Sequence, residues 1–183
     1  MNTQLVLEIG ANVKPQAHII FPDAVIETLD VDPEQKPTYL ADAGNMPAEL
    51  HGKFDAIVAS HVLEHFSYWR EQEILKGWIK CLKPNGELHI LVPSAEWAAR
   101  EVLSENPSPA LHGHMLAGQV NGWDIHLNIF TIRKLRALFE RVGLTVFRAS
   151  TGAYNIQTAK GVIHEAEQHY IAGKCGNPTL AKE

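Results

Sequence analysis

The fold is decided by residues 5–32, in which the apolar run Leu-Val-Leu-Glu-Ile ends at Gly10 and the run Ala-Val-Ile-Glu-Thr-Leu ends at Asp30. Short apolar runs that end at turn-forming residues predict buried β-strands, here over 5–9 and 24–29. Three later runs of the same kind predict further strands over 39–40, 54–59 and 87–92.

Helices are expected between and after these strands, where apolar residues recur at helical spacing. The spacing predicts one helix over 67–82, a shorter one over 95–103 and a third over 131–142, which Thr131 caps and Gly143 ends. The first crossover, between the first two strands, holds Pro15 and Pro22. These prolines shorten its helix to about a turn.

The alternation of strands and helices predicts an α/β fold with a doubly wound, mostly parallel sheet. Two closing strands are expected over 144–149 and 154–163. Residues 94–130, with their Pro-rich break, are expected to form an insertion over the sheet edge. Residues 173–183 are expected to form a flexible tail.

Length and composition fit one domain over residues 1–183. Hydrophobic residues make up 45% and charged residues 20%, as in ordinary globular proteins. The net charge is -5, so the chain lacks the concentrated basic surface that nucleic-acid binding requires. Since no signal peptide or membrane-spanning apolar run is evident, we expect a cytoplasmic protein that binds a small molecule. Self-association into a homo-oligomer is left open.

A ligand site is expected at the carboxyl ends of the first three strands, where Gly10, Asp30 and Asp42 follow the apolar runs. A glycine lets the backbone approach a ligand, and an acid about 20 residues later can bind both hydroxyls of a ribose. A dinucleotide site would need glycines at 10, 12 and 15, but Asn12 and Pro15 stand there. S-adenosylmethionine, which has no phosphate, is therefore favoured over a nicotinamide dinucleotide.

Six motifs occur in the order typical of one enzyme family: LEIGAN, ETLDVDP, ADAGNMP, FDAIVASHVLEHF, LKPNGELHILVPS and FTIRKLRALFERVGL. In this order, over residues 4–150, the chain resembles the class I S-adenosylmethionine-dependent methyltransferases. The resemblance implies a seven-stranded Rossmann-like sheet with the last strand antiparallel. It also implies that Glu8, Gly10, Ala11 and Asn12 line the methionine end of the cofactor site, Asp30 binds the ribose, Val31, Asp42 and Ala43 contact the adenine, and Ser60 and His61 close the pocket.

The segment 112–126 resembles the GGQ…H stretch of methyltransferases associated with polysaccharide and sugar pathways. This likeness implies O-methylation of a small hydroxylated acceptor, such as a sugar or glycoconjugate precursor. Trp123, near the insertion, could stack on a sugar ring. Methylation of a hydroxyl needs a base, and histidine suits that role. The catalytic candidates are His126, then His65, then His61.

Glu64 and the nearby histidines admit more than one interpretation. Glu64 could orient His65, or it could cap a helix or be solvated. His61 and His65 could join His112 or His114 around a metal ion, but because no ligand set is complete the sequence predicts no metal site. The first loop, Glu8 to Lys14, departs from the family's glycine-rich pattern. The alternative function is therefore a non-catalytic S-adenosylmethionine-binding or scaffold protein.

Overall fold

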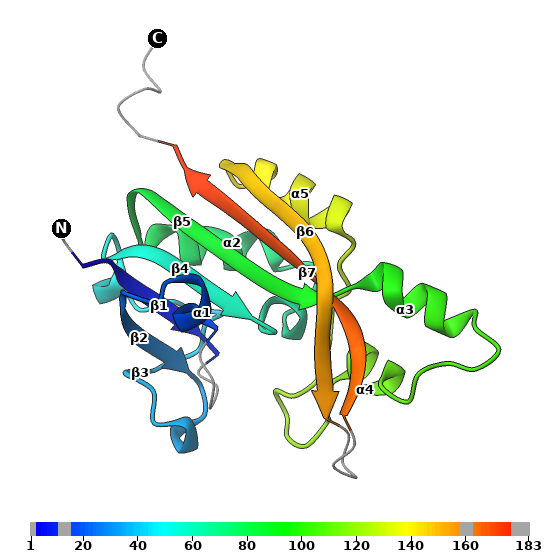
Figure 1. Ribbon diagram of the computed structural model, residues 1–183. Helices are drawn as coiled ribbons and strands as arrows, with labels where there is room; N and C mark the ends of the chain where they lie inside the picture. The colour runs from blue at the N-terminus through cyan, green and yellow to red at the C-terminus, as the bar shows by residue number, and fades with distance from the viewer. Residues whose placement is uncertain (1–2, 11–15, 158–162, 177–183) are drawn as a thin grey trace.

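Seven strands form one mixed sheet (Figure 1), in a computed structural model that describes residues 3–10, 16–157 and 163–176. The strands are β1 (Leu5–Ile9), β2 (Val25–Asp30), β3 (Tyr39–Leu40), β4 (Phe54–Ser60), β5 (Leu82–Pro93), β6 (Leu144–Gln157) and β7 (Ile163–Cys175). Their order is β3-β2-β1-β4-β5-β7-β6, and β7 runs antiparallel to both of its neighbours. The predicted α/β class, seven strands and antiparallel last strand are confirmed.

Helices and short 3-10 turns connect the strands. The helices are α1 (Ala17–Ile20), α2 (Glu71–Lys80), α3 (Ala95–Val102), α4 (Leu111–Leu116) and α5 (Ile132–Arg141), and the 3-10 turns are η1 (Pro33–Gln35), η2 (Ala48–Leu50) and η3 (Leu63–His65). In the described part of the chain, no helix is long and apolar enough to cross a membrane.

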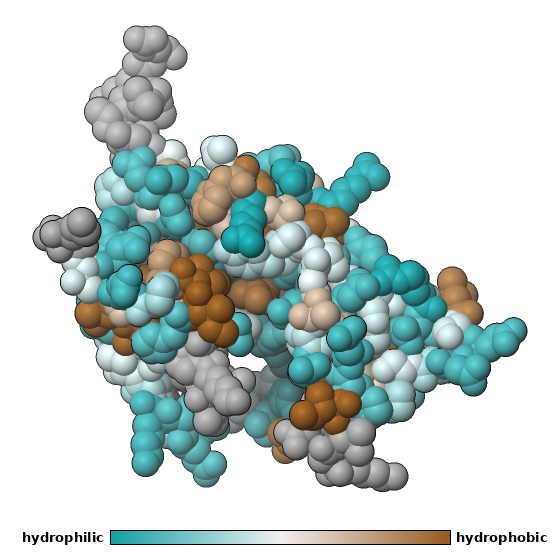
Figure 2. Space-filling model, in the orientation of Figure 1, coloured by the Kyte–Doolittle hydropathy of each residue, from teal (hydrophilic) through white to brown (hydrophobic). Residues whose placement is uncertain are grey.

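The two faces of the sheet are covered unequally. On the far face in Figure 1, α2 and α5 pack on the strands, and Trp78, Leu138 and Phe139 lie in the main hydrophobic core. On the near face α1 is the one described helix in front of the strands, and its Ala17 belongs to a much smaller core cluster. Figure 2 shows that this near face is largely hydrophilic, with hydrophobic residues gathered over α1.

The four-residue length of α1 confirms the shortened first crossover helix. Glu8, on the buried β1, holds the start of this helix. Its Oε1 accepts a hydrogen bond of 2.7 Å from the backbone N–H of Gln16, and its Oε2 one of 3.4 Å from that of Ala17. The carboxylate thus satisfies backbone donors that a helix start leaves free.

The predicted closing strands were misplaced, and residues 173–175, which were expected to belong to the tail, lie in β7. β6 runs from 144 to 157 and β7 from 163 to 175, whereas the strands were expected over 144–149 and 154–163. Residues 150–153 pair with 167–170 across the hairpin, so the expected break is a paired stretch. Gly173 lies inside the sheet, where a Cβ atom would be 2.7 Å from Cδ1 of Phe139. Residues 177–183 lie outside the described residues.

Helix α2 begins at Glu71 rather than at Ser67, because Ser67 and Arg70 instead close a turn through a backbone hydrogen bond of 2.8 Å. Residues 94–130 carry α3 and α4 and follow the carboxyl end of β5. Trp97 of α3 and Leu111 of α4 share a hydrophobic cluster with Tyr154 and Ile156 of β6. This segment is thereby fixed to the far end of the β6–β7 hairpin (Figure 1).

Candidate functional site

A first cavity of about 550 Å³ opens at the carboxyl ends of β1, β2 and β4. The structure brings together there six of the residues predicted from the sequence to bind the cofactor: Gly10, Asp30, Val31, Asp42, Ala43 and His61. His65, Phe66 and Trp123 also line this cavity. Parallel strands place their carboxyl ends at one edge, and this is why residues far apart in the chain meet here.

Asp30 and Asp42 each have one carboxylate oxygen that can accept a hydrogen bond from a ligand. Asp30 is half-buried at the end of β2, and its Oδ1 accepts a hydrogen bond of 2.8 Å from the N–H of Asp32. Asp42 is exposed, and its Oδ1 accepts one of 2.7 Å from the N–H of Gly44. Among the described residues, none donates a hydrogen bond to the Oδ2 atom of either acid, so both retain acceptor capacity for ligand hydroxyls or amines.

Gly10 is required by its conformation and by its neighbour. Its φ is +79°, in the left-handed region, and a Cβ atom would lie 2.5 Å from Cγ2 of Val62. Its N–H donates to the carbonyl of Leu29 at 2.9 Å, which joins the ends of β1 and β2. Any side chain at Gly10 would therefore push on the wall of the cavity.

The other predicted cofactor residues lie elsewhere. Glu8 is buried, is absent from the cavity lining and caps α1, and burial raises its pKa despite the hydrogen bonds from Gln16 and Ala17. Ser60 ends β4, pairs with Leu91 of β5, and does not line the cavity either. Ala11 and Asn12 lie outside the described residues. Direct cofactor contact by Glu8 and Ser60 thus has no support from their positions.

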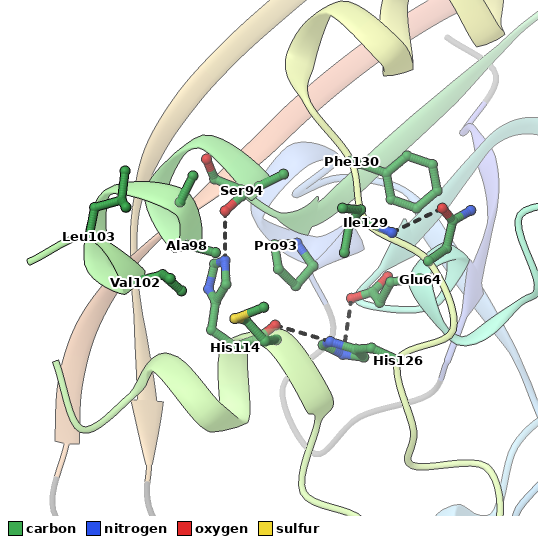
Figure 3. Close-up of a pocket in the computed structure, with 14 residues that line it drawn as sticks. Glu64, Pro93, Ser94, Ala98, Val102, Leu103, His114, His126, Ile129 and Phe130 are labelled. Carbon is green, nitrogen blue, oxygen red and sulfur yellow. Dashed lines mark hydrogen bonds and ion pairs between the residues drawn. The ribbon is translucent and has the colours of Figure 1, made fainter. Parts of the chain in front are cut away.

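A second cavity of about 370 Å³ lies beside the first, between η3, the end of β5, α3, α4 and the loop before α5. Its wall is mainly apolar (Figure 3), with Ala98, Val102 and Leu103 from α3, Met115 from α4, and Ile129 and Phe130 from the loop. Glu64 and His126 are among the few titratable groups that line it. This cavity suits a ligand with an apolar portion.

Four side chains, His61, Glu64, His65 and His126, meet between the two cavities and are called here the His–Glu cluster. Glu64 is only 1% exposed, which excludes solvation among the alternatives left open for it. Its Oε1 lies 3.2 Å from Nδ1 of His61 and 3.9 Å from Nε2 of His126. The rings of His65 and His126 pack edge to face, with centroids 4.9 Å apart. All three predicted catalytic histidines are therefore in one place.

Hydrogen bonds orient the rings of the cluster differently. Nδ1–H of His126 donates to the carbonyl of His114 at 3.0 Å, and Nδ1–H of His65 donates to the carbonyl of Ile125 at 3.1 Å. In the neutral form of each ring, Nδ1 then carries the proton and Nε2 does not. His61 has both nitrogens engaged, since its Nε2 lies 2.9 Å from Oε1 of Gln168.

The electrostatics follow from burial and from the pairing with Glu64. Burial lowers the pKa of His126, although the charge of Glu64 acts against it. For His61, burial would lower the pKa, but the hydrogen bond and charge of Glu64 outweigh it and raise that pKa. For Glu64, burial would raise the pKa, but the contact with His61 outweighs it and lowers that pKa. The cluster therefore favours an ionised Glu64 and a neutral His126.

The two histidines that the sequence offered as further metal ligands do not reach the cluster. His112 is exposed on α4. Nε2–H of the buried His114 donates to the carbonyl of Ser94 at 2.8 Å, and the hydroxyl of Tyr154 donates to its Nδ1 at 3.1 Å. Burial lowers the pKa of His114 to about 4. His114 is therefore a neutral wall residue.

The loop before α5 is tied to η3 by its backbone. The N–H groups of Leu127 and Asn128 donate to the carbonyl of Glu64 at 2.8 and 3.1 Å. Trp123, earlier in the same loop, lines the first cavity, where the cofactor is expected, whereas the sequence suggested a sugar-stacking role. Phe66 was missed, because an aromatic residue after His65 has no distinguishing pattern in the sequence.

Solved structures with this fold include a methyltransferase described as S-adenosylmethionine-dependent from Methanosarcina mazei, 15% identical, with a TM-score of 0.65, covering 96% of this chain and 94% of that one. A candidate methyltransferase from Bacillus halodurans is 12% identical, with a TM-score of 0.69 and the same coverage. The N-methyltransferase NodS from Bradyrhizobium japonicum, solved with S-adenosylhomocysteine, is 15% identical, with a TM-score of 0.56 and coverage of 96% and 78%.

No protein in the curated set matches the sequence. Residues 4–149, about four fifths of the chain, match the family described as "Methyltransferase domain". The chain therefore belongs to the methyltransferase-domain family: it is a methyltransferase with the fold of the class I S-adenosylmethionine-dependent enzymes, as the order of its motifs predicted.

Proposed function

We propose that this methyltransferase transfers the methyl group of S-adenosylmethionine to a hydroxyl of a small acceptor that has an apolar portion. The observation that carries the proposal is that two cavities flank one His–Glu cluster at the carboxyl edge of the sheet. One cavity has the acids expected for an adenosine, and the other is apolar. The reacting groups would meet at the cluster.

In the first cavity, Asp30 is proposed to bind the ribose hydroxyls through its free carboxylate oxygen. Val31 and Ala43 would contact the adenine ring, and Asp42 its exocyclic amine. Gly10, together with Ala11 and Asn12, is proposed to line the methionine end of S-adenosylmethionine. Support comes from the lining of one cavity by Gly10, Asp30 and Asp42.

The second cavity is proposed to hold the acceptor. A free sugar has many hydroxyls, and burying them against Val102, Leu103 and Phe130 would leave them without hydrogen-bond partners. Among the glycoconjugate precursors suggested by the sequence, one with a lipid or aromatic group fits this wall better. The apolar group would lie along α3, with the reacting hydroxyl at His126.

His126 is proposed as the base, because it lines the acceptor cavity and its Nδ1–H is fixed by the carbonyl of His114, which leaves Nε2 of the neutral ring to accept a proton. The hydroxyl proton passes to Nε2 as the O–CH₃ bond forms and the S–CH₃ bond breaks, leaving S-adenosylhomocysteine. In-line positioning of the two reactants can lower the barrier by about 7–11 kcal/mol, and such a base adds about 10²–10⁴-fold. His65, whose Nδ1–H also donates to a backbone carbonyl, is the second candidate, whereas both ring nitrogens of His61 are engaged.

Calorimetric titration with S-adenosylmethionine, S-adenosylhomocysteine and NAD tests the cofactor. We expect the first two to bind, NAD not to bind, and Asp30→Asn to weaken binding while Asp23→Asn, an exposed acid outside the cavity, does not. Absence of binding at millimolar concentrations would refute the proposal. Binding without methylation of any hydroxylated acceptor would favour the scaffold alternative.

A screen of acceptors with labelled methyl donor tests the reaction. Alcohols with an apolar group should be preferred over free sugars, and His126→Ala should lower kcat far more than the apparent affinity for S-adenosylmethionine. Unchanged turnover in His126→Ala would remove His126 from the proposal. The proposal keeps the predictions of a cytoplasmic location and of no nucleic-acid partner.

A further inference from the structure

Glu64 is the side chain of the cluster whose contacts are least complete. It is 1% exposed, and neither of its carboxylate oxygens receives a well-directed hydrogen bond from the described residues, although His61 lies within ion-pair distance. A buried carboxylate without hydrogen bonds is costly, and nearly all buried polar groups in proteins have partners. Apart from the contact of Oε1 with His61, the carboxylate therefore faces no donating or positively charged partner at hydrogen-bond distance among the described residues.

His65 and His126 each place a ring nitrogen near the carboxylate of Glu64. One donor atom each from Glu64, His65 and His126 lies within 4.8 Å of the other two, and Oε1 of Glu64 is 3.9 Å from Nε2 of His126. A protein ligand binds Zn²⁺ at about 2.0–2.2 Å, so two ligands of one ion are at most about 4.2 Å apart. The Glu64–His126 pair already meets this limit, and the longest separation needs to shorten by less than an ångström.

The hydrogen bonds that His65 and His126 donate to backbone carbonyls also favour a metal site. Histidines that bind a metal through one nitrogen usually donate the other N–H to a carboxylate or to a backbone carbonyl, and this fixes the tautomer. His65 does so to Ile125 and His126 to His114, at 3.1 and 3.0 Å. Both orientations are thus set before any ion arrives.

We propose that Glu64, His65 and His126 bind one divalent transition-metal ion of the zinc type. Two imidazoles and one carboxylate suit such ions, whereas Mg²⁺ prefers oxygen ligands alone. Three protein ligands leave an open position, and two of these ligands, Glu64 and His126, line the apolar cavity. The sequence predicted no metal because the spacing of His61 and His65 did not show that Glu64 and His126 complete a set.

The ion would refine the proposed function, on which this step rests. An acceptor hydroxyl in the open position would coordinate the ion, which lowers the pKa of a bound hydroxyl. The proton would then pass to water as the O–CH₃ bond formed and the S–CH₃ bond broke, and His126 would act as a ligand instead of the base while the ion is bound. His61, outside the ligand set, would keep its ion pair with Glu64.

Titration of the chelator-treated full chain with Co²⁺, in the absence of any cofactor, tests the site through the visible absorption of low-symmetry Co²⁺. We expect one ion per chain, displaced by Zn²⁺. Loss of an outer contact typically costs about 10–100-fold in metal affinity, so His65→Ala and His126→Ala should each lose about 100-fold or more. His112→Ala, an exposed histidine on α4, is the matched control and should bind like the wild type.

Thermal unfolding with and without Zn²⁺ keeps the test independent of the variants' own stability. Zn²⁺ should raise the unfolding temperature of the wild type and of His112→Ala, but not of His65→Ala or His126→Ala. No stoichiometric Co²⁺ binding by the wild type, or wild-type affinity in both ligand variants, would overturn the proposal. Methylation that persists in chelator would overturn the metal proposal and leave the proposed function standing. Co²⁺ binding without S-adenosylmethionine binding would overturn the proposed function and leave the metal site standing.

Discussion

Replacing Gly10 with alanine separates two costs that the structure assigns to this position. Alanine at a φ of +79° must adopt the left-handed region, which costs about 1–2 kcal/mol. Its Cβ would also lie 2.5 Å from Cγ2 of Val62, and overpacking of this kind costs about 1–3 kcal/mol. We expect Gly10→Ala to lower the free energy of unfolding by about 2–5 kcal/mol.

Gly143→Ala is the matched control, because Gly143 has a φ of +87° but no heavy atom within 4 Å of the position that a Cβ would occupy. It should cost only the conformational part, about 1–2 kcal/mol. In a double-mutant cycle, Val62→Ala should remove much of the additional cost of Gly10→Ala, since it deletes the opposing methyl group.

Urea unfolding of the wild type and the four variants gives these free energies, provided that the slope with denaturant is unchanged. Calorimetry on the same samples should show that Gly10→Ala also binds S-adenosylmethionine more weakly, because Gly10 and Val62 line the same cavity. The reasoning would be refuted if Gly10→Ala cost no more than Gly143→Ala, or if the cycle showed no coupling with Val62.

Three further outcomes are expected. Gly173→Ala should destabilise the chain by about 1–3 kcal/mol, while Gly152→Ala, whose Cβ position is open, should not, and equal unfolding midpoints in urea would argue against the placement of Gly173. His114 has a pKa of about 4 in the fold against 6.5 when unfolded, so protonation favours unfolding. Its contribution of about 3 kcal/mol is present above pH 6.5 and lost as the pH falls towards 4, and His114→Gln should show a shallower pH dependence of unfolding. Burial raises the pKa of Cys81 to about 11, so a thiol reagent should label it only on unfolding, and rapid labelling of the native chain would contradict its burial.

The first four strands were predicted well because each combines an apolar run with a residue that ends it. Phe54 to Ala59 is buried on both faces of the sheet, and such a run has few alternatives. The closing hairpin was predicted poorly for the opposite reason. Ser-Thr-Gly-Ala at 150–153 has the composition of a turn, but pairing with residues 167–170 overrides that local preference.

The polar character of β7 has a structural cause that sequence alone does not show. His169 is buried at 1% exposure, yet it is satisfied by Thr151 at 2.8 Å and Glu96 at 2.6 Å, partners from distant parts of the chain. The His–Glu cluster also depends on distant parts of the chain. The spacing of His61 and His65 predicted that they share a site, but the burial of Glu64 depends on the loop that carries His126. Contacts of this range are set by the tertiary fold.

Because β5 is shorter than the β6–β7 hairpin, the strands near the two cavities should differ in how easily they unfold locally. β5 pairs with β7 only as far as Gln168, and beyond it Ile163 to Glu167 pair with β6 alone. Two strands without further neighbours are only marginally stable by themselves, so this end depends on its packing against Trp97 and Leu111. The wall beside the apolar cavity can therefore open by local unfolding, with fast hydrogen exchange, while the strands under the cofactor cavity stay protected.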